Sequence, residues 1–402
     1  MQRLTVPVIL VITSACSLLL LSFGYRSSFG LFVGDVLGHY PGREIISLAL
    51  AIQNLTWGVV AVFAGGIADR FGSTKVIVGA ALLYGLGIWL TAGVETVWML
   101  NLGMGMLVGA GIAGTAFGIV LPAMVRAVGP ERRQWALGLG TAAGSFGQFL
   151  VVPLVQGLID ISNWQMALHI MALSTVLMAL LAIPLAPYSG ASQTTQEYLA
   201  EQTIPEALRE ALSHHSYLWL LAGFFVCGFN IAFITVHMPS FLSDLGFSAQ
   251  LGAWSIAIIG LCNVIGAYSS GILSSRWPMR KLLSAIYFGR AILVTVFMLT
   301  PPSIVSVIAF SIVMGFLWLA TVPPTSGLVA LMFGTRYMSL LYGVVFLSHQ
   351  LGSFSGVWLA GWLYDHYGSY DVVWWLSVGL ALFAGFAHLP IKERAVDRLV
   401  EA

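Results

Sequence analysis

Two arginines of this chain, Arg26 and Arg290, lie inside long apolar stretches. An ionised side chain at membrane depth is costly and normally faces a protein interior or a water-filled cavity. No Asp or Glu lies at a comparable depth in any of these stretches. Arg26 therefore lacks a buried acidic partner, and an anionic ligand is the partner that we favour. The alternatives are that its side chain extends to the membrane surface or pairs with Asp35.

Amide side chains recur near the middle of several apolar stretches. They are Asn54, Gln148, Asn230, Asn263 and Gln350, the last of which follows His349. Any one of them alone is more commonly an interhelical hydrogen bond, worth about 0.6 kcal/mol in a membrane. Polar groups at one depth on several helices instead mark a central binding site. We therefore predict one substrate-binding site formed by Arg26, these amides and His349.

His349 is the titratable group that we single out at this depth. Histidine changes charge near neutral pH, and the apolar stretches offer no carboxylate that could carry a proton at this level. His349 is thus our candidate for proton coupling, and the alternative is a neutral hydrogen-bonding residue. For Arg290 we favour structural packing against backbone carbonyls or Tyr287.

The remaining reactive side chains form no catalytic or metal-binding pattern. The cysteines, at positions 16, 227 and 262, all lie in apolar segments and form no Cys-x-x-Cys pair, so neither a secreted disulfide framework nor a metal site of that kind is indicated. Ser348 and His349 are neighbours on one predicted helix and point apart, so they are no nucleophile–base pair. We expect no cofactor, no metal and no enzymatic activity.

The elements that must position these residues are membrane helices. The chain has 402 residues, 58% of them hydrophobic and 8% charged, whereas soluble domains are about 25% charged. A helix that crosses a membrane needs about 20 apolar residues. Twelve stretches qualify: 8–34, 44–68, 75–93, 97–122, 134–158, 165–186, 215–242, 250–274, 281–300, 303–330, 336–362 and 370–390. They predict an all-α membrane protein in the lipid bilayer, with twelve transmembrane helices in two six-helix bundles.

The positive charges are sorted between the gaps that separate these helices. Of 17 Lys and Arg residues, 14 fall in one alternating set of gaps. These are Arg3, Arg70, Lys75, Arg126, Arg132, Arg133, Arg209, Arg276, Arg280, Lys281, Arg336, Lys392, Arg394 and Arg398. The opposite gaps contain one cation, Arg43. Because cytoplasmic loops retain cations, we expect a multi-pass protein of the cell (inner) membrane with both termini cytoplasmic. The net charge of +1 excludes nucleic-acid binding, which needs a basic face.

The one long polar interval divides the chain into two halves. Within it, Pro205 is placed to open a short amphipathic helix whose apolar stripe is Ile204, Leu208 and Leu212. We predict an N-terminal six-helix bundle at 1–186, a cytoplasmic linker at 187–214 and a C-terminal six-helix bundle at 215–402. The segments 65–75 and 271–281 share Gly and Arg in register, which indicates two repeats.

The segment after the second helix carries a family motif. Gly65, Ile67, Ala68, Asp69, Arg70 and Gly72 match the pattern G-x-L-A-D-R-x-G-R-K, although Ser73 and Thr74 replace its basic pair. With twelve helices in two sixes, the chain resembles the major facilitator superfamily over its whole length. The resemblance implies the pseudo-symmetric fold of that family and alternating access around a central cavity. It also implies a conformational latch at Gly65, Asp69, Arg70 and Gly72.

A narrower resemblance is to the bacterial monocarboxylate-transporter-like and oxalate/formate-antiporter-like branch. The first helix, with Arg26 in the segment 24–32, is similar to that branch, where a basic residue faces the cavity. The branch's D-x-x-x-R of the eighth helix is replaced here by Asn263 and Ala267. In this fold the third, sixth, ninth and twelfth helices lie outside the cavity, which makes Arg290 peripheral.

Taken with the buried cation, the resemblance implies a secondary active transporter of a small organic anion, and we expect a carboxylate. Proton symport through His349 and anion exchange both remain open as coupling modes. The alternative function is export of a neutral or cationic small metabolite or drug, with Arg26 structural. We expect a monomer.

Overall fold

The computed structural model describes residues 6–37, 42–129, 132–188, 203–334 and 337–396. These residues form helices and connecting turns, with no strand among them. Twelve helices or joined helices in the described part are long and apolar enough to cross a membrane. The predicted all-α class and the number of spans are thereby confirmed, and most boundaries lie within a few residues of the predicted ones.

The first half of the chain supplies six spans and a short 3-10 turn, η4 (Ile183–Tyr188). In chain order the spans are α1 (Val6–Ser28) continued by η1 (Phe29–Phe32) and α2 (Val33–Leu37), α3 (Arg43–Phe71), α4 (Ser73–Ala92), the joined segments α5 (Val97–Leu100), η2 (Asn101–Leu107), α6 (Val108–Thr115) and α7 (Phe117–Val128), then α8 (Arg133–Ile161) and α9 (Trp164–Leu181).

The second half begins with the short helix α10 (Ile204–Ser213) and supplies the other six spans. They are α11 (His215–Asp244), α12 (Ala249–Ser274), α13 (Met279–Leu299), the pair α14 (Ile304–Leu317) and α15 (Val322–Phe333), α16 (Met338–Tyr367) and α17 (Asp371–His388).

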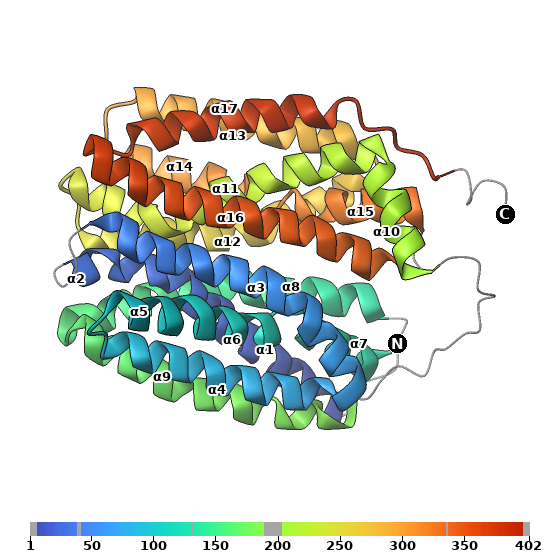
Figure 1. The fold of residues 1–402 in the computed structure, drawn as a ribbon, viewed down its shortest axis with the longest axis horizontal. Helices are drawn as coiled ribbons and strands as arrows, with labels where there is room; N and C mark the ends of the chain where they lie inside the picture. The colour runs from blue at the N-terminus through green and yellow to red at the C-terminus, as the bar shows by residue number, and fades with distance from the viewer. Residues whose placement is uncertain (1–5, 38–41, 130–131, 189–202, 335–336, 397–402) are drawn as a thin grey trace.

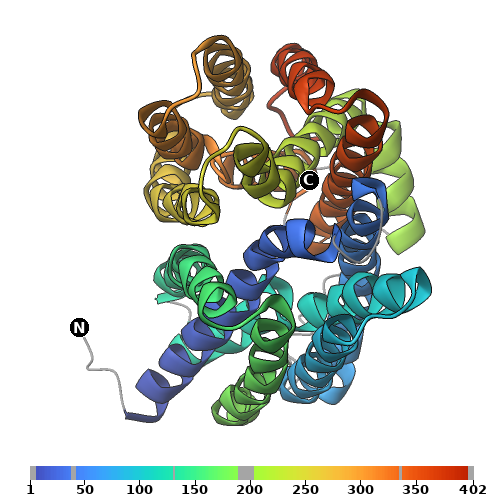
Figure 2. The same cartoon turned by 90° about the vertical axis from the view of Figure 1, so that its left-hand side faces the viewer.

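The spans lie side by side in two groups, α1–α9 and α11–α17 (Figures 1 and 2). The groups meet where α3 packs on α16 and α8 packs on α12. Helix α10 lies at the end of the spans where α1 begins and α17 ends (Figure 1). We call this the linker end, and we call the other end, where α3 begins, the opposite end. The functional residues predicted near the helix centres therefore lie between the two groups or within them.

Buried apolar side chains form two main clusters. One draws mainly on α1 to η4 and the other mainly on α10 to α17. A few side chains cross over: Val152 of α8 belongs to the second cluster and Val357 of α16 to the first. We keep the division into 1–186, 187–214 and 215–402 as a working proposal for the two bundles and their linker.

The fourth and tenth spans are interrupted at corresponding places in the two halves. In the fourth span, Ala116 has extended backbone (ψ 179°) between α6 and α7. In the tenth span, residues 318–321 separate α14 from α15. Both spans differ in this respect from the continuous helices predicted from the sequence. Interrupted helices in matching positions of two repeats commonly lie close to the binding site of a transporter-like fold.

The predicted amphipathic helix of the linker interval is present as α10, and it begins as expected with Pro205 in its first turn. Its buried face differs from the predicted stripe. Ala207 and Ala211 are buried, and Leu208 packs on the second apolar cluster. Leu212 is 48% exposed, and the side chain of Ile204 lies outside the described residues. Two alanines one turn apart let the short helix approach its neighbours closely, which a row of large side chains would prevent.

Candidate functional site

Arg26 lies in the last turn of α1, just before the chain tightens into η1. Its Nη2 donates a hydrogen bond to Oδ1 of Asn54 at 3.2 Å, and the guanidinium lies 4.9 Å from the ring centroid of Trp57. The ion pair found among the described residues involves Arg43, and no described carboxylate pairs with Arg26. The side chain of Asp35, one alternative partner, lies outside the described residues. Arg26 is therefore held by an amide and an aromatic ring.

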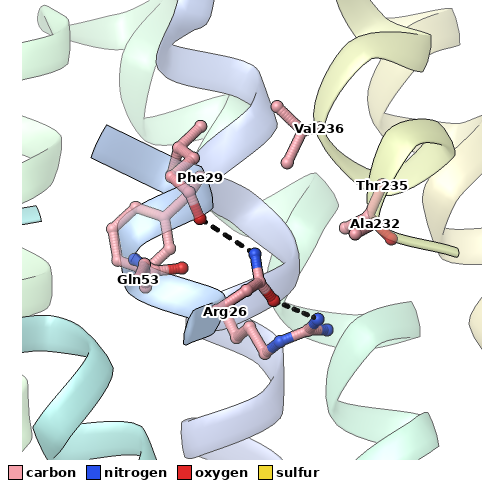
Figure 3. A pocket seen from close by; sticks show the side chains of 8 residues that line it. Arg26, Phe29, Gln53, Ala232, Thr235 and Val236 are labelled. Atoms are coloured by element: carbon pink, nitrogen blue, oxygen red, sulfur yellow. Dashed lines mark hydrogen bonds between the residues drawn. The ribbon is translucent and has the colours of Figure 1, made fainter. Parts of the chain in front are cut away.

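A small pocket opens beside Arg26 between the two halves of the chain (Figure 3). One wall comes from α1, η1 and α3, and the other comes from α11. The lining residues are Arg26, Phe29, Leu50, Gln53, Asn54, Ala232, Thr235 and Val236. The pocket thus combines one cation, two amides and a hydroxyl with apolar surface, and in this conformation its volume of about 10 Å³ is that of a nearly closed site.

A chain of hydrogen bonds leads from this pocket into the second half. Nε2 of Gln350 donates to the backbone carbonyl of Asn54 at 3.1 Å, and Oε1 of Gln350 lies 3.0 Å from Nδ1 of His349. The first bond fixes the orientation of the Gln350 amide, so Oε1 must accept and Nδ1 of His349 must carry a proton. The structure therefore brings Arg26, Asn54, Gln350 and His349 into one connected group.

Gln148 and Asn263 form a second group where α8 meets α12. Gln148 accepts from Oγ of Ser27 at 3.4 Å and donates to the carbonyl of Ile256 at 2.7 Å. Asn263 donates to Oγ of Ser145 at 2.9 Å and accepts from the backbone N–H of Leu319, in the interruption of the tenth span, at 2.9 Å. Both amides link the two halves in this conformation. Gln148 also lies near Arg26, because its hydrogen-bond partner Ser27 follows Arg26 in the chain.

Asn230 does not join either group. Its Oδ1 accepts a hydrogen bond from Oγ of Ser377 in α17 at 2.9 Å, and its side chain is buried. Asn230 therefore faces the neighbouring span of its own half in this structure.

Three residues beside Arg26 were not singled out from the sequence. Gln53 lines the pocket while its Nε2 donates to the carbonyl of Met104, in the π-helical segment η2, at 3.0 Å. Thr235 lines the facing wall, and Trp57 lies against the guanidinium. Gln53 adjoins Asn54 at the same depth and could have been found by the criterion that selected the other amides. Threonine and tryptophan are too common in membrane helices to give such a signal.

Arg290 is buried and makes the contacts predicted for it, with backbone carbonyls and with Tyr287. Its Nη2 donates to the carbonyls of Leu317 and Trp318, at 2.6 and 2.5 Å, and its guanidinium lies 5.2 Å from the ring centroid of Tyr287. Leu317 is the last residue of α14 and Trp318 is the first residue of the interruption before α15, where the helical hydrogen-bond pattern stops. A cation on a neighbouring helix thus supplies donors that the broken helix lacks.

The four residues of the predicted latch lie at the linker end of α3. Gly72 has φ 91° and joins α3 to α4, and Gly65 has open space where a Cβ would point. Arg70 is exposed, with its guanidinium 5.2 Å from the ring of Phe71. The side chain of Asp69 lies outside the described residues, so the latch stays a prediction.

Comparison with known proteins identifies the family. The profile of the Major Facilitator Superfamily matches residues 14–357. This chain belongs to that superfamily. It is 24% identical over 351 residues to the uncharacterized MFS-type transporter YcxA of Bacillus subtilis, covering 85% of this chain and 84% of that protein. It is also 24% identical over 384 residues to monocarboxylate transporter 13 of Rattus norvegicus, covering 94% of this chain and 86% of that protein.

Solved structures of the superfamily share the fold of this transporter. A bacterial homologue of the human lysosomal transporter Spinster matches with a TM-score of 0.76 at 13% identity, covering 96% of this chain and 99% of that chain. The xylose transporter XylE of E. coli matches with a TM-score of 0.71 at 16% identity, covering 96% of both chains. The protein is thus a multi-pass membrane transporter of small molecules, as predicted, and not an enzyme, and its relatives include monocarboxylate-transporter-like proteins.

Proposed function

We propose that this transporter carries a small organic anion, a carboxylate, by exposing the pocket beside Arg26 alternately to the two sides of the membrane. The observation that carries the proposal is a guanidinium at the junction of the two halves with no described carboxylate beside it. A guanidinium has five N–H donors arranged as a fork that matches a carboxylate. The described hydrogen bonds of Arg26 use one donor, to Asn54, which leaves the fork for a ligand.

The surroundings of Arg26 support a small anion over a large one. Phe29, Leu50 and Val236 supply apolar surface beside the guanidinium, so the ligand combines a carboxylate with a short apolar body. Residues of both halves line the pocket, and a ligand held between halves is released when they move apart. The name of the relative monocarboxylate transporter 13 is consistent with this substrate class.

His349 is the proposed site of proton coupling. It is 7% exposed and connects to Asn54 through Gln350. Protonation of its second ring nitrogen would place a positive charge in the same network as Arg26 and would favour an anionic ligand. In the second coupling mode, anion exchange, His349 stays neutral. A second anion then binds on the other side of the membrane, and the transporter returns to its first conformation with that anion bound.

One observation favours the alternative function, in which Arg26 is structural. The Trp57 ring and the Asn54 amide already engage its guanidinium, as they would in a carrier that exports a neutral or cationic small metabolite or drug. The two functions differ in what happens when the charge is removed, because a structural arginine affects folding and a binding arginine affects anion selectivity.

Uptake into proteoliposomes tests the proposal. The purified full chain is assayed with a panel of short mono- and dicarboxylates and with neutral and cationic metabolites, with and without a pH gradient. Hydrogen bonds to charged groups contribute about 1.5–3 kcal/mol, so we expect Arg26→Gln to reduce carboxylate uptake roughly tenfold or more. Arg26→Lys keeps the charge without the fork and should lie between Arg26→Gln and the native chain. Arg276→Gln, at an exposed arginine of the linker end, is the matched control.

The outcomes of this assay decide between the mechanisms. If Arg26→Gln leaves the uptake of every accepted carboxylate unchanged, the proposal that Arg26 binds the anion is wrong. If the native chain accepts neutral or cationic metabolites and no carboxylate, the alternative function stands. Loss of pH-driven accumulation in His349→Gln, with anion exchange preserved, assigns proton coupling to His349. Unchanged pH-driven accumulation in that variant would show that His349 does not carry the proton, and no pH-driven accumulation in the native chain would assign anion exchange.

The remaining expectations belong to the same proposal. We place the protein in the cell membrane with the linker end and both termini on the cytoplasmic side, as the charge sorting supports. We also propose that it acts as a monomer, and that Gly65, Asp69, Arg70 and Gly72 form its conformational latch. Reporter fusions at the C-terminus test the orientation, and the molecular mass of the detergent-solubilised protein tests the oligomeric state.

A further inference from the structure

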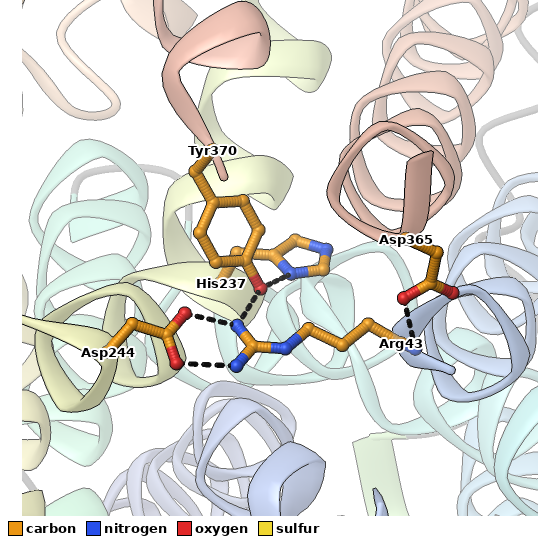
Figure 4. Close-up of polar contacts among 5 residues, drawn as sticks. All are labelled: Arg43, His237, Asp244, Asp365 and Tyr370. Carbon is orange, nitrogen blue, oxygen red and sulfur yellow. Dashed lines mark hydrogen bonds and ion pairs between the residues drawn. The ribbon is translucent and has the colours of Figure 1, made fainter. Parts of the chain in front are cut away.

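Arg43 is the one cation in the gaps at the opposite end of the helices, and a ring of residues from the second half surrounds it (Figure 4). Its two terminal nitrogens bind the two carboxylate oxygens of Asp244, at 2.7 and 2.6 Å. Nη1 also donates to the hydroxyl of Tyr370 at 2.9 Å. The guanidinium lies 3.7 Å from the ring centroid of Tyr364 and 5.3 Å from that of Tyr370. Three separate segments of the second half thus contact one side chain of the first.

The backbone at the start of α3 is held by the second half as well. The carboxylate of Asp365 accepts from the backbone N–H groups of Arg43 and Glu44, both at 2.8 Å. These are the first two N–H groups of α3, which have no partner inside the helix. Gly42, just before them, has φ 100° and no capping side chain. Helix α3 therefore has its N-terminus capped by a residue of α16, a residue of the other half.

A buried histidine fixes the position of the tyrosine in this ring. Nδ1 of His237 lies 3.0 Å from the Tyr370 hydroxyl, and Nε2 lies 3.0 Å from the carbonyl of Val357. The carbonyl can only accept, so Nε2 donates to it and Nδ1 of a neutral ring accepts from Tyr370. The hydroxyl oxygen of Tyr370 is then free to accept from Arg43, as the 2.9 Å bond requires. His237 thus holds the Tyr370 hydroxyl in the position where it accepts a hydrogen bond from Arg43.

These contacts are stronger than those of an ordinary surface ion pair. Exposed pairs contribute little to stability because solvent screens them and long side chains lose freedom. Here the Arg43 side chain is 12% exposed, its pairing with Asp244 is bidentate and two aromatic rings restrain its guanidinium. The geometry joins charge, planarity and stacking, which a lysine could not reproduce.

Packing between the halves is close along α3 and α16, from the pocket to the end where Arg43 lies. A Cβ added at Gly361 of α16 would lie 2.9 Å from the carbonyl of Arg43, and one added at Gly58 of α3 would lie 2.7 Å from Gln350. A side chain at either position would force the neighbouring atoms to shift. Arg43 therefore lies at the end of a tight interface between the halves.

We propose that Arg43, with Asp244, Asp365, Tyr364 and Tyr370, is a lock that holds the opposite end of the transporter closed. The lock must release Arg43 before the pocket can open toward that side. The inference rests on alternating exposure of the site, as the proposed function has it, but not on the identity of the substrate. It also accounts for the exception in the charge sorting, because Arg43 is retained at this end for its contacts and not as a topology signal.

Distances between spin labels on the full chain in lipid nanodiscs test the lock without any substrate. Cys16→Ala, Cys227→Ala and Cys262→Ala remove the native thiols. Glu95→Cys with Pro302→Cys then reports on the opposite end, and Lys75→Cys with Ser275→Cys reports on the linker end. The parent protein of each pair is compared with Arg43→Gln, Arg43→Lys and Asp244→Asn. Asp371→Asn removes an exposed acid at the same end, outside the lock, and is the matched control.

We expect Arg43→Gln and Asp244→Asn to add a population with a longer distance at the opposite end and a shorter distance at the linker end. Arg43→Lys should show the same shift to a smaller extent, and Asp371→Asn should match its parent. If both Arg43→Gln and Asp244→Asn keep the parent distances at both ends, the lock does not exist. Asp244→Asn keeps the test valid if the arginine variant fails to fold. Because no substrate is used, failure here is distinguishable from failure of the anion-uptake assay.

Discussion

Gln350 of α16 donates a hydrogen bond to the backbone carbonyl of Asn54 in α3, 3.1 Å away, across the boundary between the two halves. The other end of the same amide lies 3.0 Å from Nδ1 of His349, and Asn54 accepts from Arg26 through its side chain. One amide therefore connects the titratable residue of the site to its cation. Inside a membrane no water replaces such a bond. A change at one residue of this network therefore alters the hydrogen bonding of the next residue.

Replacement of Gln350 by methionine tests this connection. Gln350→Met keeps the length of the side chain and removes both hydrogen bonds, so His349 loses the partner that orients its ring. We expect a clear loss of transport rate with a small loss of stability, because a polar contact between membrane helices is worth about 0.6 kcal/mol. Initial uptake rates in proteoliposomes and thermal unfolding in detergent measure the two effects.

Gln156→Met is the matched control for that variant. Gln156 is also buried, at 5% exposure, but its described bond runs to Asp160 on the same helix. Equal transport rates in the two variants would contradict a special role for Gln350.

Glycines at the crossing of α11 and α16 allow the close approach that positions His349. A Cβ added at Gly228 would lie 1.8 Å from the carbonyl oxygen of His349, while one added at Gly343 meets nothing within 4 Å. We expect Gly228→Ala to destabilise the protein by about 1–3 kcal/mol, since the helices must shift apart. Gly343→Ala should be neutral or stabilising by roughly 0.5–1 kcal/mol, because alanine favours the helix. Melting temperatures of the two variants, compared in one detergent, decide; similar values would show that the contact is dispensable.

The capping of α10 makes the stability of this helix depend on pH, with a sign that can be predicted. Glu206 accepts a hydrogen bond from the backbone N–H of Thr203 at 2.7 Å, which lowers the pKa of this exposed carboxyl below its ordinary value. Because the folded-state pKa is the lower one, the cap stabilises α10 above the ordinary pKa of glutamate and is lost as the pH falls through the folded pKa. We expect the protection of amides in the first turn of α10, measured relative to their intrinsic exchange rates, to fall over that acidic interval. Glu206→Gln should abolish this loss of protection, and an unchanged pH profile in that variant would contradict this origin.

The spans were predictable because apolar length and charge sorting are properties of each segment by itself. The interruption of the tenth span also had a local signal, since Pro323 and Pro324 lack the N–H groups that a continuous helix needs. The break at Ala116 had a weaker signal: Gly114 and Gly118 flank it, but the nearest proline, Pro122, lies inside α7. Glycines are common in membrane helices, so whether the helix breaks there depends on how the neighbouring helices pack.

The site was predictable in depth but not in direction. Sequence position gives the height of a residue along its helix, and Arg26, Asn54, Gln350 and His349 do meet. Asn230 has the same predicted height, yet it faces Ser377, because the rotation of α11 about its axis is set by tertiary packing. The partners of Arg43 were hidden for the same reason, since Asp244 and Asp365 are far from it in the chain and meet it only when the halves pack together.

Arg290 should be required for stability and not for substrate selectivity. Arg290→Met leaves the carbonyls of Leu317 and Trp318 without the donor that now serves both. The substitution has two opposing effects on the free energy of unfolding. The loss of the hydrogen bonds destabilises the protein, whereas removal of a buried charge with no described carboxylate partner stabilises it. The carbonyl of Trp318 is buried, with Trp318 3% exposed, and that of Leu317 is partly buried. Each unsatisfied group costs about 1–3 kcal/mol.

We therefore expect Arg290→Met to lower the melting temperature while the ranking of accepted substrates stays the same. Arg276→Met, at an exposed arginine, should change neither. A melting temperature above that of the native chain would show that burying the guanidinium destabilises the protein more than its two hydrogen bonds stabilise it. A changed substrate ranking with an unchanged melting temperature would instead place Arg290 in the binding machinery.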